Sequence, residues 1–289
     1  AMDLVLYQPK ELLGEQVYSR FGAEFPIRFD FLDTMEGQNL SLQVHPLTEY
    51  IKKNFGMSYT QDESYYILDT KEDAHVYLGL KEGIQPNEMI SDLESAQRGE
   101  IVFDADKYIN KFPAKKHDHF LIPAGTCHCS GKNAMVLEIS ATPYIFTFKL
   151  WDWQRLGLDG LPRPINIEHG KHVIQWNRTT EWVKENLANA TYEVKEEGND
   201  CKIEHTGLHE LEFIETRRYT IKENSLHKTH GTVNMLNLID GKSAIIEGDF
   251  EPFIVHYAET FIIPASIKEY TIKPYGCDEI KVLKAYVRN

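Results

Sequence analysis

The chain has 289 residues, of which 42% are hydrophobic, and a formal net charge of −13. This length can form one large all-β unit or two smaller domains, with enough apolar residues for a proper core. The acidic excess argues against nucleic acid as a partner, because phosphate backbones bind surfaces rich in lysine and arginine. The sequence has no run of eighteen apolar residues and does not open with a signal-peptide pattern, so we expect a cytoplasmic protein with no membrane partner.

Short stretches of β-type sequence dominate the chain. In chain order, we expect strands near residues 27–32, 40–45, 64–69, 74–80, 119–123, 134–140, 144–151, 211–221, 233–239, 243–247, 253–256, 260–263 and 270–273. Turn residues separate them, and Asp240-Gly241 is a hairpin signal. Helical patterns occur only near 46–55, 86–97 and 180–188. Many short strands with turns between them predict barrels or sandwiches rather than a parallel α/β sheet.

Two polar segments carry most of the functional information. In Gln-Val-His-Pro at 43–46, strand alternation places Gln43 and His45 on one face. In Ile-Pro-Ala-Gly-Thr-Cys-His at 122–128, an apolar strand ends in a turn that His128 follows. Between them, Asp62-Glu63 places a carboxylate at the head of another strand. One amide, two imidazoles and one carboxylate can converge on a single divalent cation in the mouth of a small β-barrel.

The cysteines have a different explanation. Cys127 and Cys129 flank His128, but structural zinc sites usually use paired cysteines at C-x₂₋₄-C spacing with a second pair elsewhere. Strand alternation also turns both thiols away from the face that carries His128. We therefore expect ordinary buried thiols.

A weak repeat connects the two halves of the chain. Phe-Leu-Ile-Pro-Ala at 120–124 recurs as Phe-Ile-Ile-Pro-Ala at 261–265, which predicts two related barrels in tandem. Nothing like Gly-x-x-His follows Pro264, so the second copy lacks the chemistry of the first. The spacing of His227 and His230 suits one helical face better than one strand face. We expect an exposed pair in a loop rather than a second metal site.

The motifs resemble those of a known family. Gly37-x₅-Gln43-x-His45 followed by His117-x₅-Pro123-x-Gly125-x₂-His128 is similar to the two cupin motifs. Gln-Val-His-Pro, Glu-x-x-Tyr-Ile at 63–67 and Ile-Pro-Ala-Gly-Thr-x-His, in that order, resemble class I (zinc-dependent) mannose-6-phosphate isomerases over roughly residues 25–289. The resemblance implies an all-β chain of two tandem cupin (jelly-roll) barrels with a few short helices. It further implies a metal-binding domain at 1–170 and a degenerate C-terminal cupin at 171–289.

The resemblance also implies ligands, a reaction and site residues. The family's metal ligands correspond to Gln43, His45, Glu63 and His128, with one Zn²⁺ per chain or another divalent transition metal. The implied reaction is the isomerisation of mannose 6-phosphate to fructose 6-phosphate through an enediol. We expect two catalytic residues, Lys149 and Arg155, and three substrate-binding residues, Arg28, Gln61 and Trp151.

The chain departs from the family at its cationic positions. Gln61 and Asp30 stand where the family has lysine, and Lys149 stands where it has arginine. Lysine lacks the bidentate fork of arginine, and Asp30 would repel a phosphate if it faced inward. Two alternatives therefore stay open, an isomerase or epimerase of an unphosphorylated or other sugar, and a non-catalytic metal-binding cupin that senses a sugar. The expected partner is a sugar or sugar phosphate, and a homodimer is an open expectation.

Overall fold

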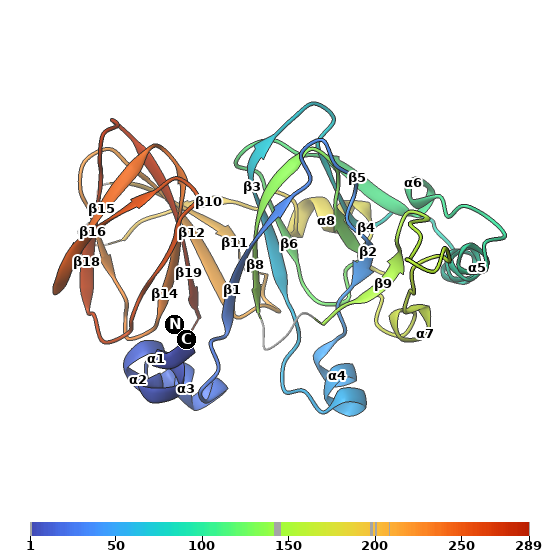
Figure 1. The fold of residues 1–289 in the computed structure, drawn as a ribbon, viewed down its shortest axis with the longest axis horizontal. Helices are drawn as coiled ribbons and strands as arrows, with labels where there is room; N and C mark the ends of the chain where they lie inside the picture. Colours follow the sequence, from blue (N-terminus) through green and yellow to red (C-terminus); the bar gives the residue numbers. More distant parts are fainter. Residues whose placement is uncertain (1, 142–145, 197–198, 200, 208, 289) are drawn as a thin grey trace. The chain divides into compact units, whose positions relative to one another are not determined.

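The protein is built mostly from β-strands, with a few short helices (Figure 1). The computed structural model describes residues 2–141, 146–196, 199, 201–207 and 209–288. The chain forms two compact units, residues 30–190 and residues 1–29 with 191–289. These units are bounded differently from the predicted domains 1–170 and 171–289, because the N-terminal segment packs with the C-terminal strands. Backbone hydrogen bonds from Val233 to Leu13 and from Ala265 to Leu12 hold it there.

The unit of residues 30–190 contains a barrel made of two sheets. One sheet has the strand order β1 (Ile27–Asp33), β8 (Ala134–Ala141), β3 (Glu63–Thr70), β6 (His119–Ile122). The other has the order β5 (Ile109–Pro113), β4 (His75–Leu80), β7 (His128–Ser130), β2 (Leu42–Val44), β9 (Phe148–Trp151). Its helices are α4 (Thr48–Phe55), α5 (Pro86–Gln97), α6 (Ala105–Tyr108), α7 (Ile167–Gly170) and α8 (Thr180–Asn186).

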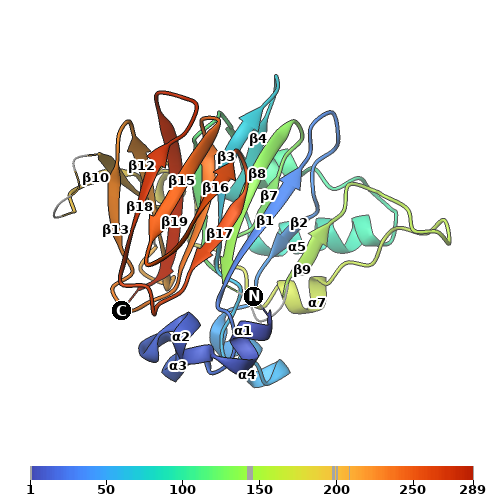
Figure 2. The ribbon, with the colours of Figure 1, turned by 60° about the vertical axis from the view of Figure 1, so that its left-hand side comes forward.

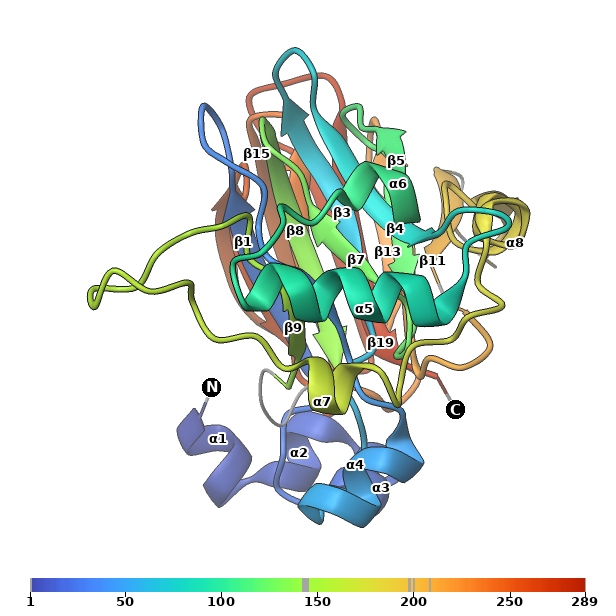
Figure 3. The same ribbon diagram turned by 90° about the vertical axis from the view of Figure 1, so that its right-hand side faces the viewer.

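Strand alternation divides this unit into two hydrophobic layers. Tyr65, Val76 and Phe120 belong to a cluster between the two sheets, in the barrel interior. Leu42 and Met89 belong to another cluster, which lies between the five-stranded sheet and α5. Figure 3 shows α5 and α7 lying across that outer face. Polar side chains interrupt the apolar interior of this barrel at one end, where β2 ends and β3 and β7 begin.

The second unit contains another two-sheet barrel, preceded by α1 (Met2–Tyr7), α2 (Pro9–Leu13) and α3 (Glu15–Phe21) (Figure 2). One sheet has the order β10 (Tyr192–Val194), β11 (Lys202–Gly207), β12 (Ile214–Ile221), β19 (Ile280–Val287), β14 (Asn234–Asp240), β17 (Thr260–Ile263). The other has the order β13 (Ser225–Lys228), β18 (Glu269–Pro274), β15 (Ser243–Gly248), β16 (Phe250–His256). Leu236, Ile246 and Val282 are among the residues of its core.

Eight strands of each barrel follow the same plan. The order β1-β8-β3-β6 corresponds to β12-β19-β14-β17, and β5-β4-β7-β2 corresponds to β16-β15-β18-β13. The predicted all-β chain of two related barrels is thus confirmed. The repeated Phe-x-Ile-Pro-Ala segment covers β6 and β17, the equivalent edge strands.

Several smaller expectations can also be compared with the structure. The helix expected at 86–97 is α5, with Pro86 in its first turn. The three N-terminal helices and strands β5, β7, β10, β11, β13 and β19 were not expected from the sequence. Cys127 and Cys129 are free and buried, as predicted, and burial raises the pKa of Cys127 to about 12. In the part of the chain that the structure describes, no helix is long and apolar enough to cross a membrane.

Candidate metal centre

Four of the predicted site residues converge at the polar end of the first barrel. Gln43 lies on β2, His45 directly follows β2, Glu63 opens β3 and His128 opens β7. His45 Nε2 lies 3.2 Å from Glu63 Oε2, and His128 Nε2 lies 2.9 Å from Glu63 Oε1. Gln43 pairs with His128 across β2 and β7, and its Nε2 lies 3.2 Å from His128 Nε2. We refer to these four residues as the ligand cluster.

Backbone carbonyl groups orient both imidazoles. His45 Nδ1 lies 2.8 Å from the carbonyl oxygen of Phe146, and His128 Nδ1 lies 2.8 Å from that of Thr126. A carbonyl oxygen only accepts, so Nδ1 carries the proton and donates it in each ring. The lone pair of each Nε2 then points toward Glu63. This is the arrangement in which protein histidines bind metals.

The centre of the cluster contains acceptor atoms that face one another. His45 Nε2 and Glu63 Oε1 are buried and have no hydrogen-bond partner among the described residues. Ligand atoms of His45, Glu63 and His128 all lie within 4.8 Å of one another. Acceptors this close repel unless a cation lies between them. Rotation of the Gln43 amide would add a neutral oxygen donor, so these side chains fit a divalent metal.

The charge of Glu63 is stabilised despite its burial. Burial alone raises the pKa of this carboxyl, but His45 and His128 together hold the pKa well below its usual range. Burial likewise lowers the pKa of His45, while the Glu63 carboxylate more than compensates and raises it. The site therefore favours a carboxylate beside a positive charge, which a bound metal would supply.

Gln61 forms a hydrogen bond that holds the carboxylate of Glu63 in place. Its Nε2 donates to Glu63 Oε2 at 3.0 Å, and its Oε1 accepts from Phe146 N at 2.8 Å. Gln61 is 3% exposed. It thus fixes the rotamer of Glu63 and ties it to the segment that orients His45. Its predicted role in substrate binding stays a prediction.

Two charged residues to which the sequence analysis gave no role, the half-buried Asp62 and the buried Arg178, hold the turn before His128. Asp62 accepts a hydrogen bond from Ala124 N at 2.7 Å, and burial raises the pKa of this carboxyl to about 6. Arg178 donates through Nη1 to the carbonyl oxygens of Pro123 and Ala124, both at 2.7 Å. No local motif marks Arg178, because it lies fifty residues beyond the turn that it supports.

Glu138 is a further candidate that the sequence reasoning did not single out as a site residue. It pairs with Tyr65 across β3 and β8, two residue pairs along from the pair of Glu63 and Ser140. Alternate residues on a strand share a face, so Glu138 lies on the interior face with Glu63. It is 6% exposed. The interior of the first barrel therefore contains a second carboxylate, two residue pairs along the strands from Glu63.

Lys149 and Arg155 occupy different positions relative to the ligand cluster. Lys149 lies on β9 and pairs directly with Gln43, so both side chains share one face of the sheet. Its Nζ lies 4.0 Å from Asp152 Oδ2. Arg155 donates through Nη1 to Asp152 Oδ1 at 2.7 Å and through Nη2 to the carbonyl oxygen of Asn39. Arg155 therefore holds Asp152, which in turn lies beside Lys149.

Trp151 and Arg28 lie on strands other than those that carry the ligand cluster. Trp151 is buried in the outer hydrophobic layer, with its ring centroid 6.0 Å from that of Phe103. It lines a separate pocket with Tyr77 and Trp153. Arg28 is half-buried on β1, in the first residues of that strand, which precede the boundary between the two compact units at residue 30. The predicted substrate contacts of Trp151 and Arg28 stay predictions.

Comparisons with known proteins point to one family. No protein-family model matches the sequence. The chain is 27% identical over 252 residues to a probable mannose-6-phosphate isomerase of Bacillus subtilis, covering 87% of this chain and 73% of the relative. It is 24% identical over 270 residues to the mannose-6-phosphate isomerase of Streptococcus mutans, covering 93% and 76%.

Solved structures show the same fold. The mannose 6-phosphate isomerase from Bacillus subtilis matches with a TM-score of 0.78 and 19% identity over 98% of this chain and 81% of that chain. A putative mannosephosphate isomerase from Archaeoglobus fulgidus matches with a TM-score of 0.75 and 20% identity over 100% and 80%.

Proposed function

We propose that this chain, a member of the mannose-6-phosphate isomerase family, is a metal-dependent isomerase that interconverts mannose 6-phosphate and fructose 6-phosphate. The observation that carries the proposal is the convergence of the ligand cluster, with its acceptor atoms already turned toward a common point. The similarity to proteins of that name extends over nearly the whole chain. This supports the reaction as well as the fold.

The ligand cluster offers donors that suit zinc. Two imidazole nitrogens, a carboxylate oxygen and an amide oxygen form a mixed N/O set that leaves room for substrate or water. When bound, the ion supplies Lewis-acid polarisation of a substrate oxygen. We expect one Zn²⁺ per chain, measured by mass spectrometry of the purified protein. If another divalent transition metal is found at the same stoichiometry, the proposed ion is wrong but the proposed metal site still holds.

The remaining side chains have distinct proposed roles. An aldose–ketose isomerase moves a proton between C2 and C1 of the sugar, which needs a base beside those carbons. Glu138 is the proposed base, since its carboxylate shares the interior face with Glu63. Lys149 would stabilise the developing oxyanion or bind the substrate phosphate. Arg155 would act through Asp152 by keeping that carboxylate beside Lys149.

One observation favours a second candidate function. Gln61 replaces a family lysine, and its amide is engaged on both sides by Glu63 and Phe146. This position contributes no positive charge to a phosphate site. An isomerase or epimerase of an unphosphorylated sugar would need no such charge.

Turnover separates these functions. We expect metal-loaded protein to convert mannose 6-phosphate to fructose 6-phosphate in a coupled assay, and to leave free mannose unchanged. Chelator-treated protein is the matched control and should be inactive until metal is restored. Turnover of free mannose alone would support the second candidate. Metal binding without turnover of either sugar would overturn both and support the sugar-sensing cupin.

Three further expectations belong to the proposal. We expect a cytoplasmic protein, with no nucleic acid or membrane partner. We also expect a homodimer, which light scattering of the purified protein tests. A monomeric mass would contradict the homodimer and leave the ligand cluster unaffected, because all four of its residues come from one chain.

A further inference from the structure

The second barrel has a different set of side chains where the first has its ligand cluster. Glu63 opens β3 and pairs with Ile122. Asn234 opens β14 and pairs with Ile263, the equivalent isoleucine of the internal repeat. Because β14 corresponds to β3 in strand order, Asn234 occupies the place of Glu63. An amide therefore replaces the central carboxylate.

The histidine ligands are also replaced. His227 pairs with Tyr270 across β13 and β18, as Gln43 pairs with His128 across the equivalent strands. The Tyr270 hydroxyl donates to Asn234 Oδ1 at 3.0 Å. His227 is buried rather than exposed in a loop as predicted, because it lies on the interior face of β13; only His230 is exposed. One imidazole, an amide and a phenol do not make a metal site.

The largest change in charge is at Lys284. Glu138 pairs with Tyr65 in the first barrel, and Lys284 pairs with Leu236 at the equivalent position of the second. Lys284 faces the interior with the core residue Val282 and is 3% exposed. A buried carboxylate in one barrel thus corresponds to a buried ammonium in the other.

The ammonium of Lys284 has no carboxylate in direct contact among the described residues, although Glu196 and Glu215 attract it from further away. Its Nζ lies 4.8 Å from the ring centroid of Tyr219 and 5.6 Å from that of Tyr286. Across the described parts of the chain, it forms no ion pair within 4.0 Å. Burial lowers the pKa of Lys284 to about 8, against the smaller opposing effect of Glu196 and Glu215, so the ammonium stays mostly charged at neutral pH. A buried charge that no carboxylate contacts directly is unfavourable, so the position favours a further anion.

His227 provides an independent sign of a missing partner. Both of its ring nitrogens are buried and have no hydrogen-bond partner among the residues described. Burial, followed by the charge of Lys284, lowers the pKa of His227 well below its usual range. A neutral imidazole retains one N–H donor. The barrel interior thus contains the charged ammonium of Lys284 and the neutral imidazole of His227, and neither has a hydrogen-bond acceptor among the described residues.

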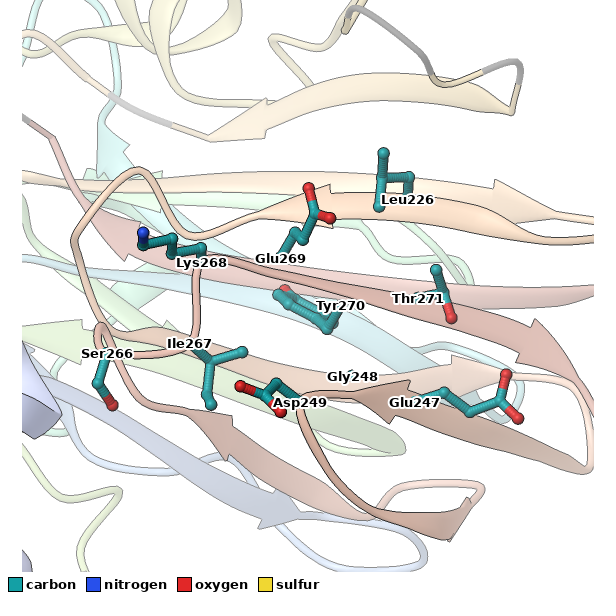
Figure 4. A pocket seen from close by; sticks show the side chains of 10 residues that line it. All are labelled: Leu226, Glu247, Gly248, Asp249, Ser266, Ile267, Lys268, Glu269, Tyr270 and Thr271. Carbon is teal, nitrogen blue, oxygen red and sulfur yellow. The ribbon is translucent and has the colours of Figure 1, made fainter.

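Lys284 lines a pocket of about 260 Å³ in the second barrel. Four cationic residues and two carboxylates line it: Arg217, Lys228, Lys284, Arg288, Glu196 and Glu215. Both carboxylates already bind Arg217, at 2.8 and 2.5 Å. The lining therefore has an excess of two positive charges. A different pocket of the same barrel, about 470 Å³, is lined by Glu247, Asp249 and Glu269 and has the opposite character (Figure 4).

We propose that the pocket around Lys284 is a second ligand site, which binds a small anion that carries a phosphate group. The excess of two positive charges matches the charge of a phosphate dianion. Lys284 supplies a charged donor and Asn234 a neutral amide. All residues of this site belong to the unit of residues 1–29 and 191–289, so the site does not depend on the proposed isomerase activity.

Calorimetric titration of inorganic phosphate into the metal-loaded protein tests the proposal. Lys284→Met removes the charge and keeps an unbranched side chain of similar length. Lys284→Arg restores a charge at the same position. Lys281→Met is the matched control, because Lys281 lies on the opposite face of β19 and pairs with Asp240. Circular dichroism checks that each variant is folded.

We expect phosphate to bind the native protein, Lys284→Arg and Lys281→Met, and to bind Lys284→Met at least about tenfold more weakly. Equal binding by Lys284→Met would overturn the proposal and would place phosphate at the ligand cluster or elsewhere. No saturable binding by the native protein up to about 10 mM phosphate would also overturn it. Glycerol phosphate is titrated in the same way. Tighter binding of glycerol phosphate than of inorganic phosphate would indicate that the site binds a phosphate ester.

Discussion

The two barrels use the same eight-strand plan for sites of opposite charge. In the first, Glu63 and Glu138 place two carboxylates inside the barrel. In the second, Asn234 and Lys284 stand at the corresponding positions. The plan places side chains at the end of a barrel but does not determine their chemistry. A few substitutions on equivalent strands convert a site for a cation into one that favours an anion.

The barrels also differ in the strands added to their edges. The first has β9 beside β2, and the second has β10 and β11 beside β12. The counterpart of β2 in the second barrel, β13, is an edge strand in the order given by the described residues. Since β9 carries Lys149 next to Gln43, the added strand brings a cation to the ligand cluster only in the first barrel.

Replacing Glu63 by asparagine, the residue at the equivalent position of the second barrel, should have the largest effect on activity. Glu63→Asn removes the carboxylate between His45 and His128, and we expect loss of stoichiometric metal and a fall in activity of more than about 100-fold, beyond the effect of an outer-shell change. Metal content and coupled turnover measure this. Glu251→Asn on the exposed surface of the second barrel is the control. Full metal occupancy in Glu63→Asn would refute the ligand assignment.

Removing the buried charge of the second barrel should stabilise it. The folded pKa of Lys284 lies below the ordinary 10.5 because of burial, so protonation favours the unfolded chain. This penalty is complete below about pH 8 and disappears as the pH rises toward 10.5. We expect Lys284→Met to raise the free energy of unfolding by roughly 1–4 kcal/mol at pH 7. The gain should shrink near pH 10.5.

Urea unfolding of native protein, Lys284→Met and Lys281→Met at pH 7 and pH 10 measures this difference. The comparison between variants cancels the titration of groups remote from Lys284, while Glu196 and His227 titrate as part of its effect. A loss of stability in Lys284→Met at pH 7 would show that Lys284 makes a favourable contact in the absence of ligand. Saturating phosphate should stabilise the native protein, so that it becomes more stable than Lys284→Met.

The sequence predicted the ligand cluster more completely than the residues around it. Gln43, His45 and His128 lie in short motifs that specify both the residue type and the strand end. The role of Gln61 depends on Phe146, which lies 85 residues away, so no local pattern indicates it. Lys284 could not be predicted as interior, because lysine is rarely buried and it interrupts the apolar pattern of β19.

The support of Glu63 by Gln61 should matter less than Glu63 itself. Gln61→Ala removes the donor to Glu63 Oε2 and the acceptor for Phe146 N, so the carboxylate loses one fixed orientation. We expect metal affinity to fall about 10–100-fold, as for other outer-shell changes. Competition with a chromogenic chelator measures it. Gln85→Ala, at an exposed position, should leave affinity unchanged. If the metal affinity of Gln61→Ala is unchanged, Gln61 does not support the metal ligand, and its predicted role in substrate binding becomes the favoured one.

The smallest expected effect concerns the strand that only the first barrel has. Lys149→Met removes the cation that β9 places beside Gln43, while Lys149 is exposed enough for its loss to leave the fold intact. We expect KM for mannose 6-phosphate to rise about tenfold if Lys149 binds the phosphate, because one charge-assisted hydrogen bond is lost. A fall in kcat at constant KM would assign Lys149 to the oxyanion instead.

Lys149→Arg sharpens this distinction. Arginine supplies a bidentate fork, so binding of a phosphate should be retained or improved. Metal content should stay the same in both variants, since Lys149 lies beside the ligand cluster without belonging to it. If neither variant changes KM or kcat, the positive charge on β9 serves only Asp152, and the added strand is structural. The difference between the barrels would then reside entirely in the side chains of the eight shared strands.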